Sequence, residues 1–492
     1  MRVDWRTVLA LVGTVLQSLA VPLVLSALVA VGYAESPVPF LLPAALALAA
    51  GFGLSRFPSD DIGIREAFLI VAMVWLAVAT VGALPFLVAG TGVFANPADA
   101  AFESMSGITT TGATVVVDFD IHPRSLLFWR ALLQWLGGLG ILVLAVGLLS
   151  QLGVGGAQLM ETETQTQDVT KLTPRIEGTA RLLGGLYLGL TGGLVLLLLA
   201  LSAVDLAPNM TPYNAVTHAL TTVSTAGFSP EAASAGAFSP IVQWVLIAFM
   251  LVGATNFVLL YAITRGDFGR VRRSEELRFY LAVVAGGSAL VAGVLAFDGE
   301  FGSVEATVRH ATFQVVSIVT TTGYATVDFD LWSPAAKHLL FLGMFVGGMA
   351  GSTTCSLKAF RWLVVVKTLR RDLFTELHPE AVRPVRVGER VVDEATVRDV
   401  NAYVLLGLVG FALLTVVVVV QTRGTGVEEF DAMGIAASTF LNIGPAFGAA
   451  GPYGTYAGLP TTTKWVLVVL MWVGRIEIIP VLVVLTPEFW RG

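Results

Sequence analysis

The sequence is poor in charge and in cysteine. Only 13% of its 492 residues are charged, whereas a soluble protein of this length carries roughly 25%. The one cysteine, Cys355, excludes both an intrachain disulfide and a cysteine-based metal cluster. The five histidines are scattered, and the net charge of −6 is too small to indicate a partner by itself.

Apolar residues take the place of the missing charge. They make up 55% of the chain, and the mean hydropathy is +0.79. The first apolar segment, residues 8–31, is too long for a signal peptide and lacks a clear cleavage site, so we expect it to be retained. Since a spanning helix needs about 20 apolar residues, the sequence predicts an all-α integral membrane protein with about ten spanning helices.

A short glycine turn recurs four times along the chain. It reads TTTG at residues 109–112 and again at 320–323, and these two copies leave through similar segments, ATVVVDFD and ATVDFD. VSTAG at 223–227 and NIG at 442–444 complete the set. Each glycine follows a segment too short to cross a bilayer and precedes a long apolar helix; the short segments are residues 99–108, 213–222, 304–319 and 428–441.

The spacing of these turns predicts an internal repeat of about 100 residues. After two leading helices, each unit consists of a long helix, a short re-entrant helix, a glycine turn and a second long helix, arranged around one central pore. The predicted divisions are 1–58 for the leading helices, 59–152 for the first repeat, 153–265 for a linker and the second repeat, 266–370 for the third repeat, and 371–492 for a cytoplasmic linker and the fourth repeat.

The four turns together predict an ion filter. Irregular backbone at membrane depth is tolerated only where it is buried in protein or lines a water-filled path. The carboxyl end of each short helix favours a cation, glycine lets carbonyl oxygens point inward, and rings of carbonyls replace the hydration shell of an alkali cation. One turn alone is typical of a common helix C-cap. The candidate filter residues are Thr110, Thr111, Gly112, Thr225, Ala226, Gly227, Thr321, Thr322, Gly323, Asn442, Ile443 and Gly444.

Most lysines and arginines fall on one side of this topology. By the positive-inside rule that side, with the N-terminus, is cytoplasmic. Its linkers carry Lys171, Arg175, Arg270, Arg272, Arg273, Arg370, Arg371, Arg383, Arg386 and Arg390. The opposite side carries acidic residues, which form either a rim that concentrates cations or merely solvated loop charges; they are Glu35, Asp118, Asp120, Asp328, Asp330, Glu428, Glu429 and Asp431.

Longer motifs identify a family resemblance. They read TTTGATV, WRALLQWLGGLGILVLAVGLL, STAGFS, GGMAGSTTCSLKAFR, LNIGPAFGAAGP and GRIEIIPVLVVLTPEFWR. Over nearly its whole length the chain resembles the Trk, Ktr and HKT superfamily of potassium transporters, and most of all its TrkH branch. The resemblance implies K⁺ as the transported ion, with carbonyls beside Gly112, Gly227, Gly323 and Gly444 lining the filter. One glycine per repeat goes with looser selection of K⁺ over Na⁺, and glycine at all four positions favours K⁺.

The resemblance also places a gate below the filter. Residues 347–356 break an apolar helix with Gly and Ser, which is typical either of a simple kink or, as the family implies, of an intramembrane gating loop. Its candidate residues are Gly347, Gly348, Gly351, Ser352, Thr353 and Thr354. The family implies that Arg475 projects into the pore as an electrostatic barrier; the alternative is a buried salt bridge to another repeat. This chain departs from the family at GSTTCSLK, where relatives are richer in glycine.

Other polar residues favour structural interpretations. We expect Lys358 and Arg361 to extend toward the cytoplasmic interface, and Trp129 and Arg130 to anchor the start of a helix at the membrane surface. His218 lies on a short helix, where a packing histidine is more common than a ligand.

Two other classes of function remain as alternatives. A Na⁺- or H⁺-coupled cation symporter also has broken helices, although such folds usually contain inverted repeats. A membrane hydrolase would need a Ser–His or paired-Asp site at depth, and the predicted helices contain no such pair, so we expect a transporter and not an enzyme.

The expected setting follows from the resemblance and from the linkers. We expect a multi-pass protein of the cell membrane in contact with lipid, without an organic cofactor or nucleic acid. The family implies a homodimer and a separate cytosolic TrkA-type nucleotide-binding regulatory subunit. The longest linker, about residues 370–396, is too short to hold a nucleotide-binding domain.

Overall fold

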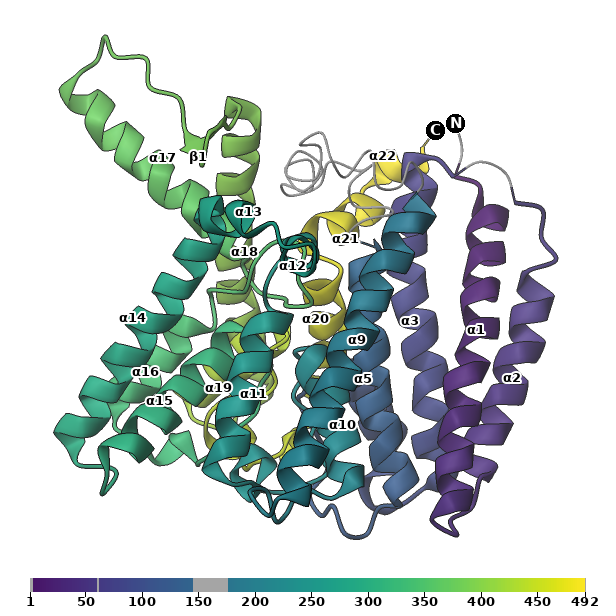
Figure 1. Cartoon of the computed structure of the whole chain (residues 1–492). Coiled ribbons are helices and arrows are strands. Elements are labelled where there is room, and N and C mark those ends of the chain that lie inside the picture. The colour runs from purple at the N-terminus through teal and green to yellow at the C-terminus, as the bar shows by residue number, and fades with distance from the viewer. Residues whose placement is uncertain (1–2, 60–61, 145–175, 492) are drawn as a thin grey trace.

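The computed structural model describes residues 3–59, 62–144 and 176–491. This part of the chain is helical apart from one two-stranded hairpin, and both ends of the chain lie on the same side of the molecule (Figure 1). The predicted boundary at 152–153 and the linker residues Lys171 and Arg175 lie outside the described residues.

Two leading helices, α1 (Trp5–Gly32) and α2 (Val38–Leu54), pack against each other beside the rest of the bundle (Figure 1). Their backbones approach closely at two glycines, because a Cβ added at Gly13 would lie 2.8 Å from the carbonyl oxygen of Gly51. Small residues permit such close crossings in membranes, where packing rather than the hydrophobic effect holds helices together.

After these two helices, one pattern of elements follows four times. The first long helices are α3 (Ile64–Ala89), α9 (Ile176–Ala203), α14 (Glu275–Asp298) and α18 (Glu394–Gln421). The short helices are α4 (Pro97–Ile108), α10 (Pro212–Val223), α15 (Val304–Val319) and α19 (Glu429–Phe440). The closing helices are α5 (Arg124–Leu144), α11 (Pro240–Gly253) with α12 (Phe257–Thr264), α16 (Pro334–Gly343) with α17 (Ala359–Leu377), and α20 (Thr461–Arg475) with α21 (Ile478–Leu485). The short helices thus lie within three residues of the predicted ranges.

Smaller elements join these helices. On the side of the chain ends lie α13 (Phe268–Arg273), α22 (Pro487–Trp490) and the hairpin of β1 (Arg386–Val387) and β2 (Arg390–Val391) (Figure 1). Single 3₁₀ turns occupy the loops at Gly92–Ala95, Ser234–Ala237, Phe329–Leu331, Gly448–Ala450 and Tyr456–Gly458.

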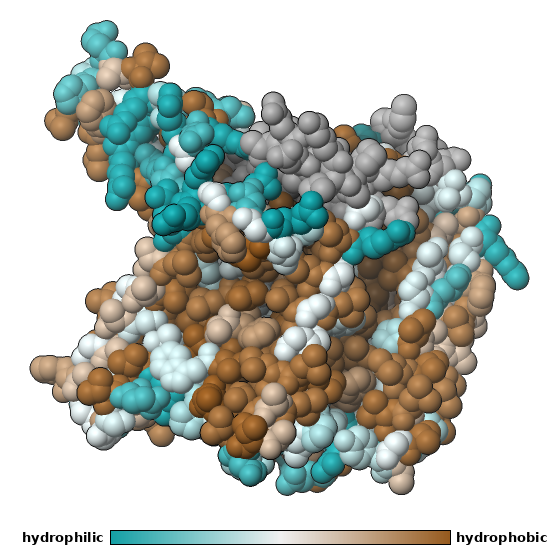
Figure 2. Space-filling model, viewed as in Figure 1, coloured by the Kyte–Doolittle hydropathy of each residue, from teal (hydrophilic) through white to brown (hydrophobic). Residues whose placement is uncertain are grey.

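The long helices are suited to cross a membrane. Among the described residues six helices are long and apolar enough, namely α1, α3, α5, α9, α14 and α18, and two bent pairs, α11–α12 and α20–α21, bring the number to eight. The other two of the ten predicted spans are α2, with 17 residues, and the pair α16–α17, which a loop separates. Figure 2 shows the matching surface, an apolar band between hydrophilic ends.

Three of the four closing helices are broken partway. The chain bends by 106° between α11 and α12 and by 109° between α20 and α21, and residues 344–358 form a loop between α16 and α17. The sequence predicted only this loop. Asn256 marks the first bend, because its side chain accepts hydrogen bonds from the first amides of α12, and Glu477 marks the second with a positive φ of 66°.

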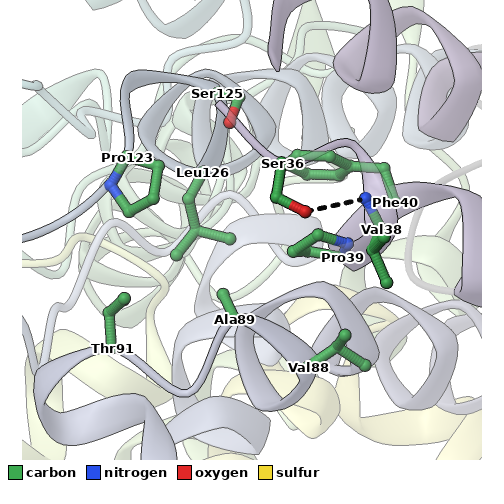
Figure 3. Close-up of a pocket in the computed structure, with 10 residues that line it drawn as sticks. All are labelled: Ser36, Val38, Pro39, Phe40, Val88, Ala89, Thr91, Pro123, Ser125 and Leu126. Atoms are coloured by element: carbon green, nitrogen blue, oxygen red, sulfur yellow. Dashed lines mark hydrogen bonds between the residues drawn. The ribbon is translucent and has the colours of Figure 1, made fainter. Parts of the chain in front are cut away.

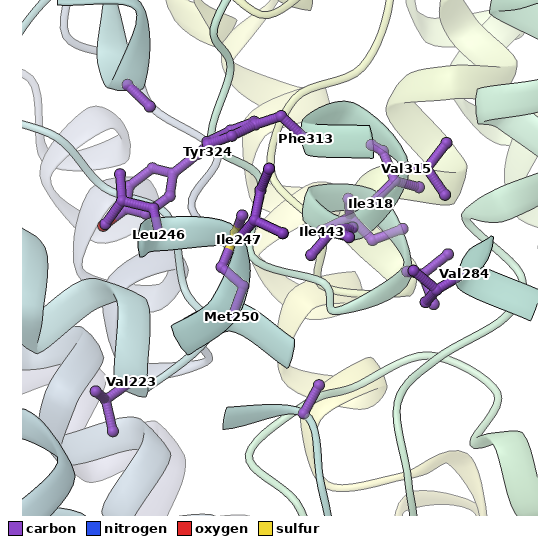
Figure 4. Close-up of a cluster of buried hydrophobic side chains, with 14 of the residues drawn as sticks. Val223, Leu246, Ile247, Met250, Val284, Phe313, Val315, Ile318, Tyr324 and Ile443 are labelled. Carbon is purple, nitrogen blue, oxygen red and sulfur yellow. The ribbon is translucent and has the colours of Figure 1, made fainter. Parts of the chain in front are cut away.

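Buried apolar side chains fill the space between the repeats. Figure 4 shows part of the largest cluster, in which Leu246 and Met250 of α11 lie near Tyr324, and Ile318 of α15 lies near Ile443. The cluster therefore joins elements of the second, third and fourth units behind their turns, and its close packing fixes where the short helices end.

Candidate functional site

Three of the four short helices begin with a side-chain cap. Asn96, Thr211 and Ser303 cap the starts of α4, α10 and α15 with side-chain oxygens that accept amide hydrogen bonds. A buried ion pair of 2.5 Å between Asp99 and Lys464 ties α4 to α20. The glycine turns that follow the four short helices contact one another.

All four short helices end in the same left-handed turn. Its first residue has a positive φ, which is 53° at Thr110, 51° at Thr225, 52° at Thr321 and 54° at Asn442. The amide of the second residue donates to the carbonyl five residues earlier at 2.8–2.9 Å, in the pairs Thr111–Ser106, Ala226–Thr221, Thr322–Ser317 and Ile443–Ser438. Because threonine is β-branched and rarely adopts such angles, three of these turns carry strain that their surroundings must hold.

The glycines bring the four turns into a closed ring. Each has a positive φ, which is 82° at Gly112, 80° at Gly227, 83° at Gly323 and 109° at Gly444. A Cβ added at any of them would overlap the carbonyl oxygen that precedes the next glycine: Gly112 meets Ala226, Gly227 meets Thr322, Gly323 meets Ile443, and Gly444 meets Thr111. The turns therefore contact each other head to tail in chain order, and only glycine fits at these four positions.

A cavity of about 190 Å³ lies at this ring and is lined by all four glycines. The acidic residue that lines it is Glu231, which was not predicted from the sequence. Of the residues predicted for the acidic rim, Glu35 accepts hydrogen bonds from the Arg124 and Ser125 amides at the start of α5. Within the described residues no cluster of His, Cys, Asp and Glu side chains is placed to hold a metal ion, so main-chain and hydroxyl oxygens are the ligands available at the ring.

Serine hydroxyls brace three of the turns from their own short helices. Ser106 donates to Ala113 at 2.5 Å, Ser317 to Tyr324 at 2.7 Å, and Ser438 to Gly444 at 2.8 Å, in each case to a carbonyl oxygen at or just after the glycine. The second turn has Thr221 at this position, and its hydroxyl donates instead to the Thr217 carbonyl within α10 at 3.0 Å. The ring is thus uneven at the second turn.

Helix α5 supplies polar side chains to the turns. Arg130 is 1% exposed and pairs with the buried Glu103 of α4 at 2.7 Å, while its other nitrogens donate to Thr114 and to the carbonyl of Ser229. The expectation that Arg130 anchors the helix at the membrane surface is therefore wrong. Trp129 is also fully buried and donates to the Gly82 carbonyl at 3.0 Å.

The loop between α16 and α17 lies directly against two of the turns. Thr353 shares a hydrogen bond of 2.9 Å with Thr225, and the amide of Cys355 donates to the Thr321 hydroxyl at 3.1 Å. The loop folds tightly, since a Cβ at Gly348 would lie 2.7 Å from the Ala254 carbonyl and Ser352 bonds Thr354 at 2.8 Å. Gly347 and Gly351 occupy equally restricted positions, one against the Cys355 carbonyl and one with a φ of 73°.

Arg475, the last residue of α20, joins this loop to α5. It is 2% exposed, and its guanidinium donates to the Thr353 carbonyl at 3.1 Å, the Cys355 sulfur at 2.8 Å and the Gly137 carbonyl at 2.8 Å. The alternative of a salt bridge to another repeat finds no acidic partner among the described residues. The positive charge is therefore held by main-chain carbonyls and a thiol beside the turns.

A second charged contact lies where α20 meets α21. Arg361 is 3% exposed, pairs with Glu477 at 2.7 Å, and lies 3.7 Å from the centre of the Tyr403 ring. The expectation that Arg361 extends to the cytoplasmic interface is therefore wrong. Lys358 turns back onto the Thr354 hydroxyl at 3.0 Å. His218 is a packing residue as expected, bonded to the Asn214 carbonyl and the Ser229 hydroxyl.

Another cavity lies away from the turns. It measures about 240 Å³ and lies between α2, the end of α3 and the start of α5 (Figure 3). Phe40, Val88 and Leu126 are among its apolar lining residues, and its polar ones are Ser36, Thr91 and Ser125. None of the turn residues lines it, so it is separate from the candidate site.

The roles of three residues at the site were not predicted from the sequence. Gln134 and Arg130 bond to Ala226 and Ser229, which are 92 and 99 residues away along the chain, and only the packing of α5 against α10 reveals this. Glu103 bonds Thr114 and Val115, which follow the first turn. Glu103 and Arg130 do stand out as charges within apolar segments, a pattern that indicates a buried pair or a pore-facing group. Gln134 lies in an apolar helix where a single amide is easily overlooked.

Comparison with known proteins agrees with this architecture. The family model of TrkH cation transport proteins matches residues 44–491. The Trk system potassium uptake protein TrkH of Halomonas elongata is 36% identical over 99% of both chains, and that of Vibrio parahaemolyticus is 34% identical over 99% of this chain and 100% of its own. The crystal structure of the potassium transporter TrkH from Vibrio parahaemolyticus aligns with a TM-score of 0.88 at 33% identity, covering 99% of this chain and 100% of that one. The chain therefore belongs to the TrkH family of cation transport proteins.

Proposed function

We propose that this membrane protein takes up potassium ions through a channel-like pore. The observation that carries the proposal is the closed ring of four glycine turns around one cavity. Such a ring offers main-chain oxygens at a spacing that side chains cannot disturb, and oxygen cages of this kind replace the hydration shell of K⁺. The relatives that match over the whole chain are named potassium uptake proteins.

The filter in this proposal consists of the residues around the four glycines. Their carbonyl oxygens bind K⁺, and the carboxyl ends of the short helices add partial negative charge. These residues are Thr110, Thr111, Gly112, Thr225, Ala226, Gly227, Thr321, Thr322, Gly323, Asn442, Ile443 and Gly444.

The gate is the loop 344–358 together with Arg475. Thr353 and Cys355 contact two turns of the ring from this loop, so a loop in this position blocks an ion leaving the ring until it moves. Its glycines and hydroxyl residues, Gly347, Gly348, Gly351, Ser352, Thr353 and Thr354, allow it to fold without regular helix. Arg475 adds a positive charge on the ion path and also ties the loop in place.

The repeats divide the chain as the sequence predicts, at 59–152, 153–265, 266–370 and 371–492 after the leading helices of 1–58. The pattern of helix, short helix, turn and helix supports each division where residues are described. The first helices of the repeats then start near the basic side of the molecule.

The setting is a cell membrane, with both chain ends in the cytoplasm. The arginines of α13 and of the β1–β2 hairpin lie on the side of the chain ends (Figure 1), which supports this orientation through the positive-inside rule. The protein assembles as a homodimer and is regulated by a separate nucleotide-binding subunit of the TrkA type, which docks on that basic side. The family membership supports both statements.

The test is ion flux through the purified protein in lipid vesicles. We expect uptake of K⁺ and Rb⁺ to exceed that of Na⁺, and the current to reverse at the K⁺ equilibrium potential. Because a Cβ at Gly227 overlaps the Thr322 carbonyl, Gly227→Ser reduces the K⁺/Na⁺ uptake ratio, while the exposed Gly424→Ser, which meets no neighbouring atom, leaves that ratio unchanged. A reversal potential that also depends on Na⁺ or H⁺ would instead identify a coupled symporter.

A further inference from the structure

The second turn of the ring is held by a residue from the first repeat. Gln134 lies on α5, four residues after Arg130, and is fully buried. Its carboxamide reaches the turn that follows α10, although 92 residues separate Gln134 from Ala226. No sequence motif of the second repeat predicts this contact.

Two hydrogen bonds bracket Gly227. The Gln134 Nε2 donates to the Ala226 carbonyl at 2.6 Å, and the Phe228 amide donates to the Gln134 Oε1 at 2.9 Å. A carboxamide carries both a donor and an acceptor on one planar group, so it satisfies the residues before and after the glycine at once. Neither a carboxylate nor an apolar side chain of the same size does this.

The Ala226 carbonyl has a second neighbour. It is the oxygen that a Cβ on Gly112 would overlap, so it lies at the contact between the first and second turns. By fixing this oxygen, Gln134 sets the distance between two adjacent turns of the ring. The buried side chain is itself held, because α5 packs against both α4 and α10.

The second turn differs from the other three in how its short helix braces it. Each of the other three turns receives a hydroxyl from a serine of its own short helix. At the equivalent position of the second turn the Thr221 hydroxyl bonds the Thr217 carbonyl within α10 and the Tyr324 hydroxyl next to the third turn, rather than a carbonyl of its own turn. The two hydrogen bonds of Gln134 are therefore made to the turn that lacks the serine hydrogen bond.

We propose that Gln134 is a positioning residue that sets the ion preference of the pore by holding the second turn at its spacing from the first. This inference rests on the proposed filter. Gln134 does not need to touch the ion: it acts through the Ala226 carbonyl and the Phe228 amide. Arg130 acts beside it on the Ser229 carbonyl, further along the same segment.

The test compares Gln134→Leu and Gln134→Glu with the unchanged protein in K⁺ and Na⁺ uptake into vesicles. Leucine removes both hydrogen bonds, and glutamate keeps the acceptor but places an oxygen against the Ala226 carbonyl. We expect both variants to lower the K⁺/Na⁺ uptake ratio on the order of fivefold, because both lose the hydrogen bond from Gln134 to the Ala226 carbonyl. Na⁺ uptake should rise relative to K⁺, which a mere loss of folded protein would not cause.

Gln243→Leu is the matched control. Gln243 is also buried and lies on α11, but its carboxamide donates to the Ala235 and Phe238 carbonyls beyond the turn, so its loss should reduce folded protein and leave the uptake ratio unchanged. Gly227→Ser separates the two proposals. A lowered ratio in Gly227→Ser with an unchanged ratio in both Gln134 variants would overturn the role of Gln134 alone. An unchanged ratio in Gly227→Ser would overturn the filter, and the role of Gln134 with it.

Discussion

At the scale of single residues, the candidate site is made of main chain pressed against main chain. The positive φ angles of Thr110, Thr225 and Thr321 show that the turns are strained, and strained backbone persists only where the surroundings over-determine it. Here the surroundings are hydroxyls, the Gln134 carboxamide and the neighbouring turns. Each of these contacts is local, but together they hold the carbonyl oxygens of the ring in place.

Arg475 gives a prediction at this scale. A unit charge roughly 8 Å from a cation opposes it by about 2 kcal/mol at an effective dielectric constant of about 20, so Arg475→Ala should raise K⁺ flux on the order of thirtyfold. Arg475→Lys keeps the charge but not the planar group that reaches both Thr353 and Gly137. Because lysine keeps the charge, K⁺ flux into vesicles should stay near the original value in Arg475→Lys. Equal flux in the two variants would argue against an electrostatic barrier.

The sequence was informative about some of these residues and not about others. The glycines and the ends of the short helices were predictable, because a turn at membrane depth needs both. The contacts of Gln134, Arg130 and Arg361 were not, since a helix sequence does not say which neighbour each face meets. Arg130 and Arg361 both resembled interface residues because each lies near the predicted end of an apolar span.

At the scale of elements, the breaks in the closing helices matter most. Helices α11 and α20 end against the loop 344–358, as the hydrogen bonds of Gly253 and Arg475 with Thr353 show. The loop follows α16 directly, and its Cys355 amide bonds the Thr321 hydroxyl of the ring. Broken helices at membrane depth leave backbone groups to be satisfied by other protein groups, and the loop 344–358 accepts and supplies several of these bonds. Of the three breaks, only the loop was predicted, from its run of small residues. The other two lie at Asn256 and Glu477, and the sequence around these residues did not predict a bend.

Helix α18 offers a test outside the membrane. Asp393 caps its first turn, and hydrogen bonds from the Thr396 amide and hydroxyl lower the pKa of its carboxyl. Asp393→Ala should lower the stability by about 0.5–1 kcal/mol, whereas Asp393→Asn keeps an acceptor and should be close to neutral. Because the folded pKa lies below the unfolded value of about 3.9, the charge-dependent stabilisation is present above that pH and is lost as the pH falls through the folded pKa.

Unfolding in detergent at pH 7 and at pH 3 measures both effects. At the lower pH the free energy of unfolding of the original protein should fall relative to that of Asp393→Asn. A difference that does not change with pH would contradict the assigned cap.

At the scale of the whole molecule, four units from one chain surround one ring in chain order. Each unit uses its short helix to direct a turn inward and its long helices to face neighbours or lipid, which explains the apolar band of Figure 2. This overall plan was predictable from the repeated glycine turns. The order in which the units contact one another was not predictable, because the spacing of the turns along the chain does not determine which two turns are in contact.

Ion binding should stabilise the assembled molecule. Since the ring exists only in the folded protein, K⁺ should raise the melting temperature in detergent relative to choline at equal ionic strength, with a gain of about 2.7 kcal/mol at a hundredfold excess over its Kd. Na⁺ should raise it less. Gly227→Ser should reduce the difference between K⁺ and Na⁺, and identical melting in all three salts would contradict a K⁺ site in the ring.

The head-to-tail contact of the glycines also bears on how such a pore can change. In a filter assembled from four identical subunits, one mutation changes all four equivalent positions. In this single chain, a mutation changes one turn and leaves the other three as they are. Each turn nevertheless contacts the next one, so the effect of replacing Gly112 depends on which residues occupy positions 227 and 444. Paired replacements at adjacent corners should therefore behave differently from the sum of the single ones.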